Sequence, residues 1–205
     1  ENRLTGQSRD TAVQTLAQVG HSVYEVPLGA TIPAYYGLVA SAYMHEHGVS
    51  ERDLAELAVL MRRHASMHPG AQFRDPITVE DVLQSKPIAA PLKLLDCCPV
   101  SDGGVAFVVS REPRGPGAVR IRGTGQAHTH QHISAAPSLT QFGASQCVRR
   151  ALSQADVQLS DIRYLAIYDS FTITLMVLLE EIGLAPRGQA GQLARSGYFD
   201  RNGKL

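Results

Sequence analysis

Residues 164–183 read YLAIYDSFTITLMVLLEEIG and join a short apolar run, a polar loop and a longer apolar run. The first run predicts a compact strand over residues 164–167, and the last predicts a helix over residues 173–182 that Gly183 ends. The loop between them, residues 168–172, follows the carboxyl end of the strand and precedes a helix N-terminus. Ligands of open α/β sheets bind at such positions, so this loop is the first candidate site.

The amide groups at the start of this helix could stabilise an anion or a polarised carbonyl oxygen. The alternative is purely structural, because Asp169 or Ser170 could simply cap the helix. Spacing alone leaves both interpretations open.

Helices and strands are predicted in alternation on either side of this stretch. Residues 105–110 and 119–123 are short, β-branched segments that predict strands. Ser138 and Gln141 predict a capping box for a helix that ends near Gln154. This order favours a layered α/β architecture with a mainly parallel sheet.

The first half of the chain is predicted to be mostly helical. Residues 34–47 have apolar side chains at helical spacing, and Ser50 with Asp53 predicts a capping box for the next helix. A short helix is expected over residues 78–83. Residues 111–117 contain prolines and glycines among charged residues, which predicts a linker between two halves.

The composition excludes several classes of protein. The chain has 205 residues, with 19 Lys and Arg against 19 Asp and Glu, and this neutral balance argues against nucleic-acid binding. No apolar run approaches the roughly 18 residues that span a bilayer. The 3 cysteines cannot form a closed disulfide framework, so a reducing, cytoplasmic location is expected.

Two clusters could carry chemistry by themselves. His128, His130 and His132 alternate as zinc ligands on a strand would, but no carboxylate lies near them to orient the imidazoles. We therefore predict a polar loop and no metal site. Cys97 and Cys98 precede a predicted buried strand without a neighbouring histidine, so we interpret them as structural thiols rather than as nucleophiles.

Several segments, in order, resemble the thiolase superfamily, in particular the sterol-carrier-protein-type thiolases and thiolase-like acetyl-CoA acetyltransferases. The segments are residues 43–46, 63–65, 71–82, 94–103, 127–130, 168–172 and 180–183. The resemblance implies two related halves in a layered α/β/α/β/α sandwich, present here as a partial fold. Residues 1–110 would end the N-terminal half, residues 111–117 would be the crossover linker, and residues 118–205 would begin the C-terminal half.

The resemblance also implies that this sequence is the middle portion of a longer enzyme. In thiolases a cysteine nucleophile precedes the matching region, and a Gly-His-Pro segment and a second cysteine follow it. None of the three motifs occurs in the 205 residues, so we expect the chain to be incomplete for catalysis, and none of its cysteines is assigned the nucleophile's role.

The thiolase loop that corresponds to residues 168–171 begins with Asn, or with His in the sterol-carrier type, and helps to build an oxyanion hole. Tyr168 stands there in this sequence, as in thiolase-like aldolases that cleave steroid side-chain CoA esters with a small partner protein. We predict that Tyr168 is catalytic and that Cys98, Ser101, Asp169 and Ser170 bind substrate. Cys98 is expected beside the pantetheine arm of CoA.

The leading hypothesis is a thiolase-type acyl-CoA C-acyltransferase that acts on 3-oxoacyl-CoA in lipid or sterol side-chain metabolism. One alternative is a retro-aldolase that cleaves a steroid or other CoA ester with a partner subunit, and another is a noncatalytic thiolase-like subunit. CoA would be a substrate, and no cofactor is implied. A homodimer or a thiolase-like heteromer is expected.

Overall fold

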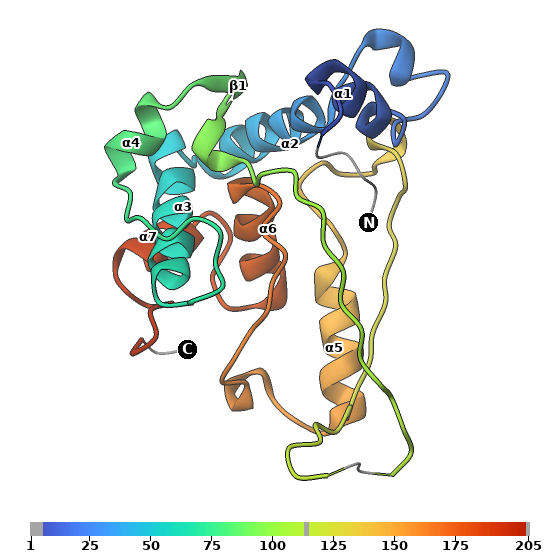
Figure 1. Cartoon of the computed structure of the whole chain (residues 1–205), viewed down its shortest axis with the longest axis vertical. Helices are drawn as coiled ribbons and strands as arrows, with labels where there is room; N and C mark the ends of the chain where they lie inside the picture. The colour runs from blue at the N-terminus through green and yellow to red at the C-terminus, as the bar shows by residue number, and fades with distance from the viewer. Residues whose placement is uncertain (1–5, 113–114, 204–205) are drawn as a thin grey trace.

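The computed structural model describes residues 6–112 and 115–203 and is mostly helical (Figure 1). Its helices are α1 (Arg9–Ala17), α2 (Ile32–His47), α3 (Glu51–Ser66), α4 (Val79–Gln84), α5 (Ala144–Ala155), α6 (Thr172–Ile182) and α7 (Ala190–Arg195). Short 3-10 turns occur at η1 (Val26–Leu28), η2 (Leu94–Asp96), η3 (Ile133–Ala135) and η4 (Leu159–Asp161). Strand β1 (Pro87–Ala89) pairs antiparallel with β2 (Leu92–Lys93). No helix among these residues is long and apolar enough to cross a membrane.

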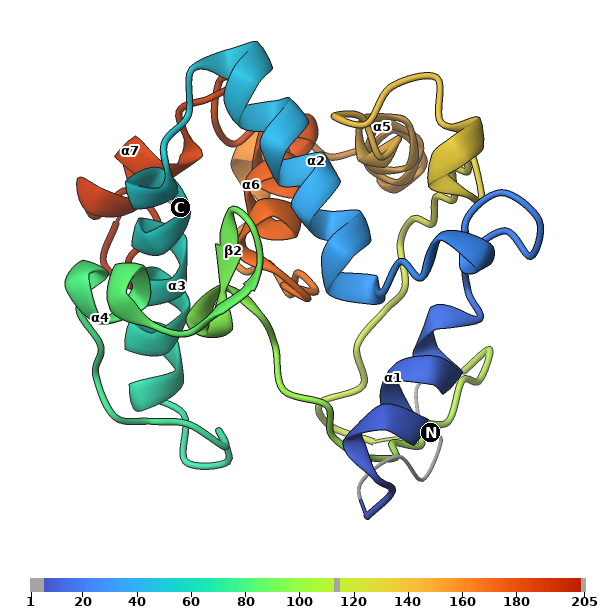
Figure 2. The same ribbon diagram turned by 90° about the horizontal axis from the view of Figure 1, so that it is seen from above.

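Helix α6 forms the centre of the core, between α3 and α5 in Figure 1 and under α2 in Figure 2. Every residue from Thr172 to Val177 is buried, which is more than one full turn, so the helix is covered on all sides. Tyr43 from α2 and Leu57 from α3 pack into the same cluster with no exposed surface. Burial of one aliphatic side chain contributes about 2 kcal/mol to the stability of the fold. Helix α6 is therefore held by packing on several sides.

Several of the predicted helix ends are confirmed. Ser50 and Asp53 form the capping box of α3, and Thr78 begins α4 in the same way. Gly48 and Gly183 end α2 and α6 in the left-handed region, at φ 67° and 97°, where a residue without a Cβ is unstrained.

The predicted capping box at Ser138 is wrong. Helix α5 begins at Ala144, after Gly143 at φ 81°, and has no side-chain cap. The Ser138 hydroxyl instead accepts a hydrogen bond from the amide of Thr140 at 3.2 Å and contacts the Thr140 hydroxyl at 3.1 Å. Serine forms such a local turn as readily as it caps a helix, and here the turn is favoured.

The expected parallel sheet is not present among residues 6–112 and 115–203, whose one sheet is the antiparallel pair β1 and β2. Residues 105–110, 119–123 and 164–167 form no ladder there, because a strand needs the backbone of a neighbour to complete its hydrogen bonds. In the first two segments the apolar side chains are open to solvent, with Val105 90%, Phe107 81% and Val119 92% exposed. In the third, Leu165 and Ile167 are half-buried and pack against the core.

One of these segments packs against a helix instead. A Cβ on Gly123 or on Gly125 would overlap the backbone of α5, so both glycines permit the close approach. The Thr124 amide donates to the Gln154 side chain at 2.8 Å. The predicted linker, residues 111–117, includes residues 113–114, which lie outside the described residues. Residues 201–203 form a turn.

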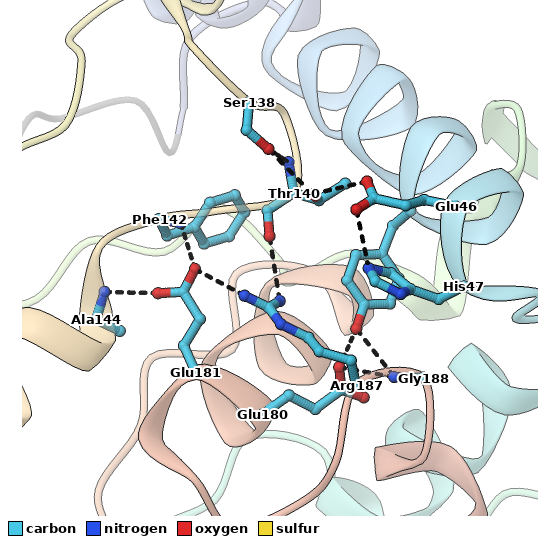
Figure 3. A network of polar contacts seen from close by, with 11 residues as sticks. Glu46, His47, Ser138, Thr140, Phe142, Ala144, Glu180, Glu181, Arg187 and Gly188 are labelled. Atoms are coloured by element: carbon cyan, nitrogen blue, oxygen red, sulfur yellow. Dashed lines mark hydrogen bonds and ion pairs between the residues drawn. The ribbon is translucent and has the colours of Figure 1, made fainter.

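Two consecutive buried glutamates fix the C-terminal half of α6 (Figure 3). Glu181 accepts hydrogen bonds from the amides of Phe142 and Ala144, both at 2.6 Å, and contacts the Arg187 guanidinium at 3.4 Å. The guanidinium also donates to the Thr140 carbonyl oxygen at 3.1 Å. The segment before α5 is thereby tied to α6.

Glu180 accepts from the Tyr43 hydroxyl and from the amides of Gly188 and Ala190, at 3.0 and 3.1 Å. Burial nevertheless raises the pKa of the Glu180 carboxyl. The network joins α2, α6 and the segment before α7, so these glutamates have a structural role.

Candidate functional site

The loop before α6 is held by a second loop that follows β2. The Cys98 amide donates to the Ser170 carbonyl oxygen at 3.0 Å, and Cys97 and Phe171 form an antiparallel bridge. The Thr172 hydroxyl donates to the buried Asp96 carboxylate at 2.8 Å. Four of the five predicted site residues therefore lie together, because Tyr168 and Asp169 directly precede this pairing.

A cavity lies on each side of the paired loops. The first has a volume of about 410 Å³ and is lined by Tyr168 and Ser170 together with α2 and residues 127–133. The second has a volume of about 360 Å³ and is lined by Asp169 and Cys98 together with α3 and residues 71–73. Alternate residues of an extended chain point to opposite sides, which explains why neighbouring loop residues line different cavities.

Ser101, the fifth predicted residue, lies apart from the paired loops. Its hydroxyl donates to the side-chain oxygen of Gln72 at 3.2 Å, and Gln72 lines the second cavity. Ser101 itself is exposed and lines neither cavity. Its predicted contact with substrate would therefore be at the edge of the second cavity.

The thiols and the phenol of the site are protonated at neutral pH. Burial, followed by the nearby Asp96 carboxylate, raises the pKa of Cys97 to about 12, and burial also raises the pKa of Cys98. The Tyr168 hydroxyl is hydrogen-bonded to the Cys98 thiol, and the electrostatic influence of Cys98 raises the pKa of Tyr168. A phenol in this state donates a hydrogen bond to an oxygen that gains negative charge.

The carboxylate in the second cavity is also affected by its surroundings. Burial raises the pKa of Asp169, which favours its neutral form. Asp96, next to the same cavity, has a raised pKa for the same reason, although Lys93 and Thr172 donate hydrogen bonds to it.

The histidine segment, residues 128–132, lines the first cavity. His128 is hydrogen-bonded to the Gln126 side chain at 2.8 Å, and His130 to the Thr129 hydroxyl at 2.9 Å. In both cases the partner is a neighbouring side chain. Within the described ranges, no three His, Cys, Asp or Glu residues are grouped so that they could hold a metal ion.

Two groups at the site were not predicted from the sequence. Tyr36 stacks on Phe171 with ring centroids 4.3 Å apart and lines the first cavity. Glu25 is buried and lines the same cavity, and its carboxylate accepts from the amides of His21 and Ser134, both at 2.7 Å. The apolar face of residues 34–47 indicated the position of Tyr36, but no local pattern indicated Glu25.

Comparison with known proteins agrees with the motifs. Residues 125–205 match the family model described as thiolase C-terminal domain-like. The chain is 35% identical over 196 residues to the steroid side-chain-cleaving aldolase of Thermomonospora curvata. The matched region covers 88% of this chain and 49% of the relative. It is 31% identical over 189 residues to the acetyl-CoA acetyltransferase of Methanocaldococcus jannaschii, covering 89% of this chain and 48% of the relative.

A solved structure described as the Ltp2-ChsH2(DUF35) aldolase matches with a TM-score of 0.74 and 32% sequence identity. The match covers 88% of this chain and 50% of that one. The chain spans about half the length of the curated relatives it matches, from 48% to 54% for the first four. The ordered motifs, the matching family model and the shared partial fold agree, and the chain belongs to the thiolase superfamily.

Proposed function

We propose that the protein acts on a CoA thioester and cleaves the bond between C2 and C3 of its acyl group by a retro-aldol reaction. The observation that carries this proposal is a protonated Tyr168 phenol on a cavity of about 410 Å³. At the position of Tyr168, thiolases are expected to have the amide of an asparagine or the imidazole of a histidine. The similarity to a steroid side-chain-cleaving aldolase supports the same reaction.

In this reaction the carbinol proton of a 3-hydroxyacyl-CoA passes to water, and the bond between C2 and C3 breaks. The electron pair moves to the thioester, which becomes an enolate and is then protonated at C2. The products are a ketone or aldehyde and a shorter acyl-CoA. Tyr168 would donate a hydrogen bond to the oxygen on which charge develops, an interaction that becomes stronger in the transition state.

Acyl transfer to or from 3-oxoacyl-CoA is the second candidate, supported by the 31% identity to an acetyl-CoA acetyltransferase. It needs a thiolate nucleophile. Cys97 is protonated, with a pKa raised to about 12, and the pKa of Cys98 is raised as well. Thiolysis would therefore need a nucleophile other than these two thiols.

We assign the CoA arm to the second cavity, of about 360 Å³. Cys98 and Asp169 line it, which supports their assignment as substrate-binding residues, and Ser101 would contact the arm at the edge through Gln72. Ser170 would bind the acyl group on the opposite side, in the first cavity. The paired loops would then hold the thioester between the two cavities.

The proposed full fold is the layered α/β/α/β/α sandwich, with the division at residues 111–117. The exposed Val105, Phe107 and Val119 support it, because these side chains would be covered once the extended segments pair with further strands. A homodimer or a thiolase-like heteromer with a small partner protein is proposed by analogy with the matched assembly. The three free cysteines agree with a cytoplasmic location.

Two assays of the full native protein distinguish these functions. One supplies a 3-hydroxyacyl-CoA branched at C3 and detects ketone and shorter acyl-CoA, and the other supplies 3-oxoacyl-CoA with free CoA. We expect turnover in the first assay only. Turnover in the second alone would establish acyl transfer and exclude the aldol assignment. Turnover in neither would indicate the third hypothesis, a noncatalytic subunit.

A further inference from the structure

One part of the first cavity, its polar end, contains polar groups that the proposed reaction does not use. Glu25, Tyr35 and His132 all line this end, and the Glu25 side chain is only 6% exposed. They come from three separate segments: the residue before η1, the first turns of α2 and the residue before η3. Their convergence therefore depends on the tertiary fold.

The carboxylate of Glu25 is fixed in position and charged. Oε2 accepts from the His21 amide and Oε1 from the Ser134 amide, both at 2.7 Å. Burial opposes ionisation, but these hydrogen bonds outweigh it and lower the pKa of Glu25. Each oxygen accepts one amide, so lone pairs remain for a further donor.

Two buried polar atoms beside this carboxylate have no hydrogen-bond partner, namely the Tyr35 hydroxyl and Nδ1 of His132. Nδ1 of His132 is 3.9 Å from Oε2 of Glu25, which is too long for a hydrogen bond. Leaving such groups unpaired destabilises the folded protein, so a buried polar atom without a partner needs an explanation.

The backbone of Gly20 lies against these two groups. A Cβ on Gly20 would overlap the Tyr35 hydroxyl and lie 3.2 Å from Oε2 of Glu25. The Tyr35 hydroxyl and the Glu25 carboxylate are therefore both next to Gly20, close to each other. The remainder of the cavity wall includes apolar side chains such as Ile32, Val39 and Leu178.

We propose that this polar end binds a hydroxyl group at the far end of a mainly apolar acyl group. The hydroxyl would donate to the Glu25 carboxylate and accept from Tyr35, and so would satisfy both groups at once. A carbonyl oxygen can accept from Tyr35 but has no proton for Glu25. The volume of about 410 Å³ lies within the usual range of small-molecule sites.

This inference rests on the proposed function in one respect: the ligand is assumed to carry its thioester at Tyr168. It specifies the substrate class further, as acyl-CoA molecules with a hydroxyl group remote from the reacting carbons. Binding of the polar end requires no turnover, so it can be tested separately from the reaction.

The test uses decalol and decalone, a two-ring alcohol and the ketone with the same carbon skeleton, titrated into the full protein by calorimetry. A hydrogen bond to a charged acceptor predicts that the alcohol binds about tenfold more tightly than the ketone. Equal affinities, or no binding of either probe, would overturn the inference. Loss of turnover with CoA thioesters, with the alcohol preference retained, would overturn the proposed reaction alone.

Tyr35→Phe is the informative variant, because it removes a hydroxyl that has no partner in the free protein. The thermal midpoint should stay the same or rise, while the affinity for decalol falls about tenfold. Tyr164→Phe is the matched control, since Tyr164 is 84% exposed and lies outside the cavity. A lower thermal midpoint for Tyr35→Phe with unchanged decalol affinity would mean that only ordered water occupies this end.

Discussion

At the scale of single residues, the chemistry of the candidate site depends on the protonation states of its side chains. The Cys98 thiol and the Tyr168 phenol hydrogen-bond each other, and both have raised pKa values. Tyr168 is 75% exposed, so its hydroxyl is accessible to a ligand in the first cavity. A neutral donor in this position stabilises a developing oxyanion without needing a base to activate it.

Tyr168→Phe should therefore lower turnover of the full protein about 100-fold, because it removes one donor to the oxyanion. The thermal midpoint should hardly change, since the side chain is 75% exposed. Turnover numbers and melting curves check both statements, with Tyr164→Phe as the control for removal of an exposed hydroxyl. Unchanged turnover in Tyr168→Phe would remove this residue from the reacting site.

At the scale of elements, local sequence signals determine where several helices begin and end. The Ser50 hydroxyl accepts from the Asp53 amide at 3.4 Å, and the Asp53 carboxylate accepts from the Ser50 amide at 2.9 Å. These bonds satisfy groups that the first turn of α3 would otherwise leave unpaired. Helix α3 in turn forms a wall of the second cavity through Leu57 and Met61.

Ser50→Ala should reduce the free energy of unfolding by about 1 kcal/mol, because it removes this N-cap. Denaturant titration followed by circular dichroism measures the change. Ser41 is exposed in the interior of α2, so Ser41→Ala should have no effect or a slightly stabilising one. Equal results for the two variants would show that the capping box does not stabilise α3.

At the scale of the whole molecule, buried carboxylates join segments that are far apart in the sequence. Glu25 links the turn before α2 to η3 by accepting from the Ser134 amide, 109 positions away. Glu181 joins α6 to the segment before α5 in the same manner. These contacts position the walls of the first cavity relative to one another.

The Glu25 contact predicts a dependence of stability on pH. Its pKa is lowered from an ordinary value of 4.5, so the stabilisation is fully present above that pH. It is lost as the pH falls through the lower pKa of the folded protein. The thermal midpoint of the wild type should therefore be higher than that of Glu25→Gln at pH 7. This difference should become smaller under acidic conditions.

Melting curves of the wild type and of Glu25→Gln across this pH range measure the effect. Glu112→Gln serves as the matched control, because Glu112 is exposed. A difference between the wild type and Glu25→Gln that stayed constant with pH would show that the charge on Glu25 does not contribute.

The sequence by itself determined the helices with strong local signals and the polar loop before α6. Ser50, Thr78 and Gly183 mark helix ends through contacts within a few residues, so pattern is sufficient to locate them. The ordered motifs likewise indicated the superfamily. The prediction at Ser138 failed because a local turn and a helix cap use the same residue type.

The tertiary structure decided everything that depends on partners distant in sequence. The pairing of Cys98 with Ser170, the burial of Glu25 and the two cavities all arise from contacts between separate segments. The same reason explains the extended segments: an alternating pattern predicts a strand's shape, but only a neighbouring backbone completes its hydrogen bonds. Local chemistry thus determined the elements, and long-range contacts determined the site.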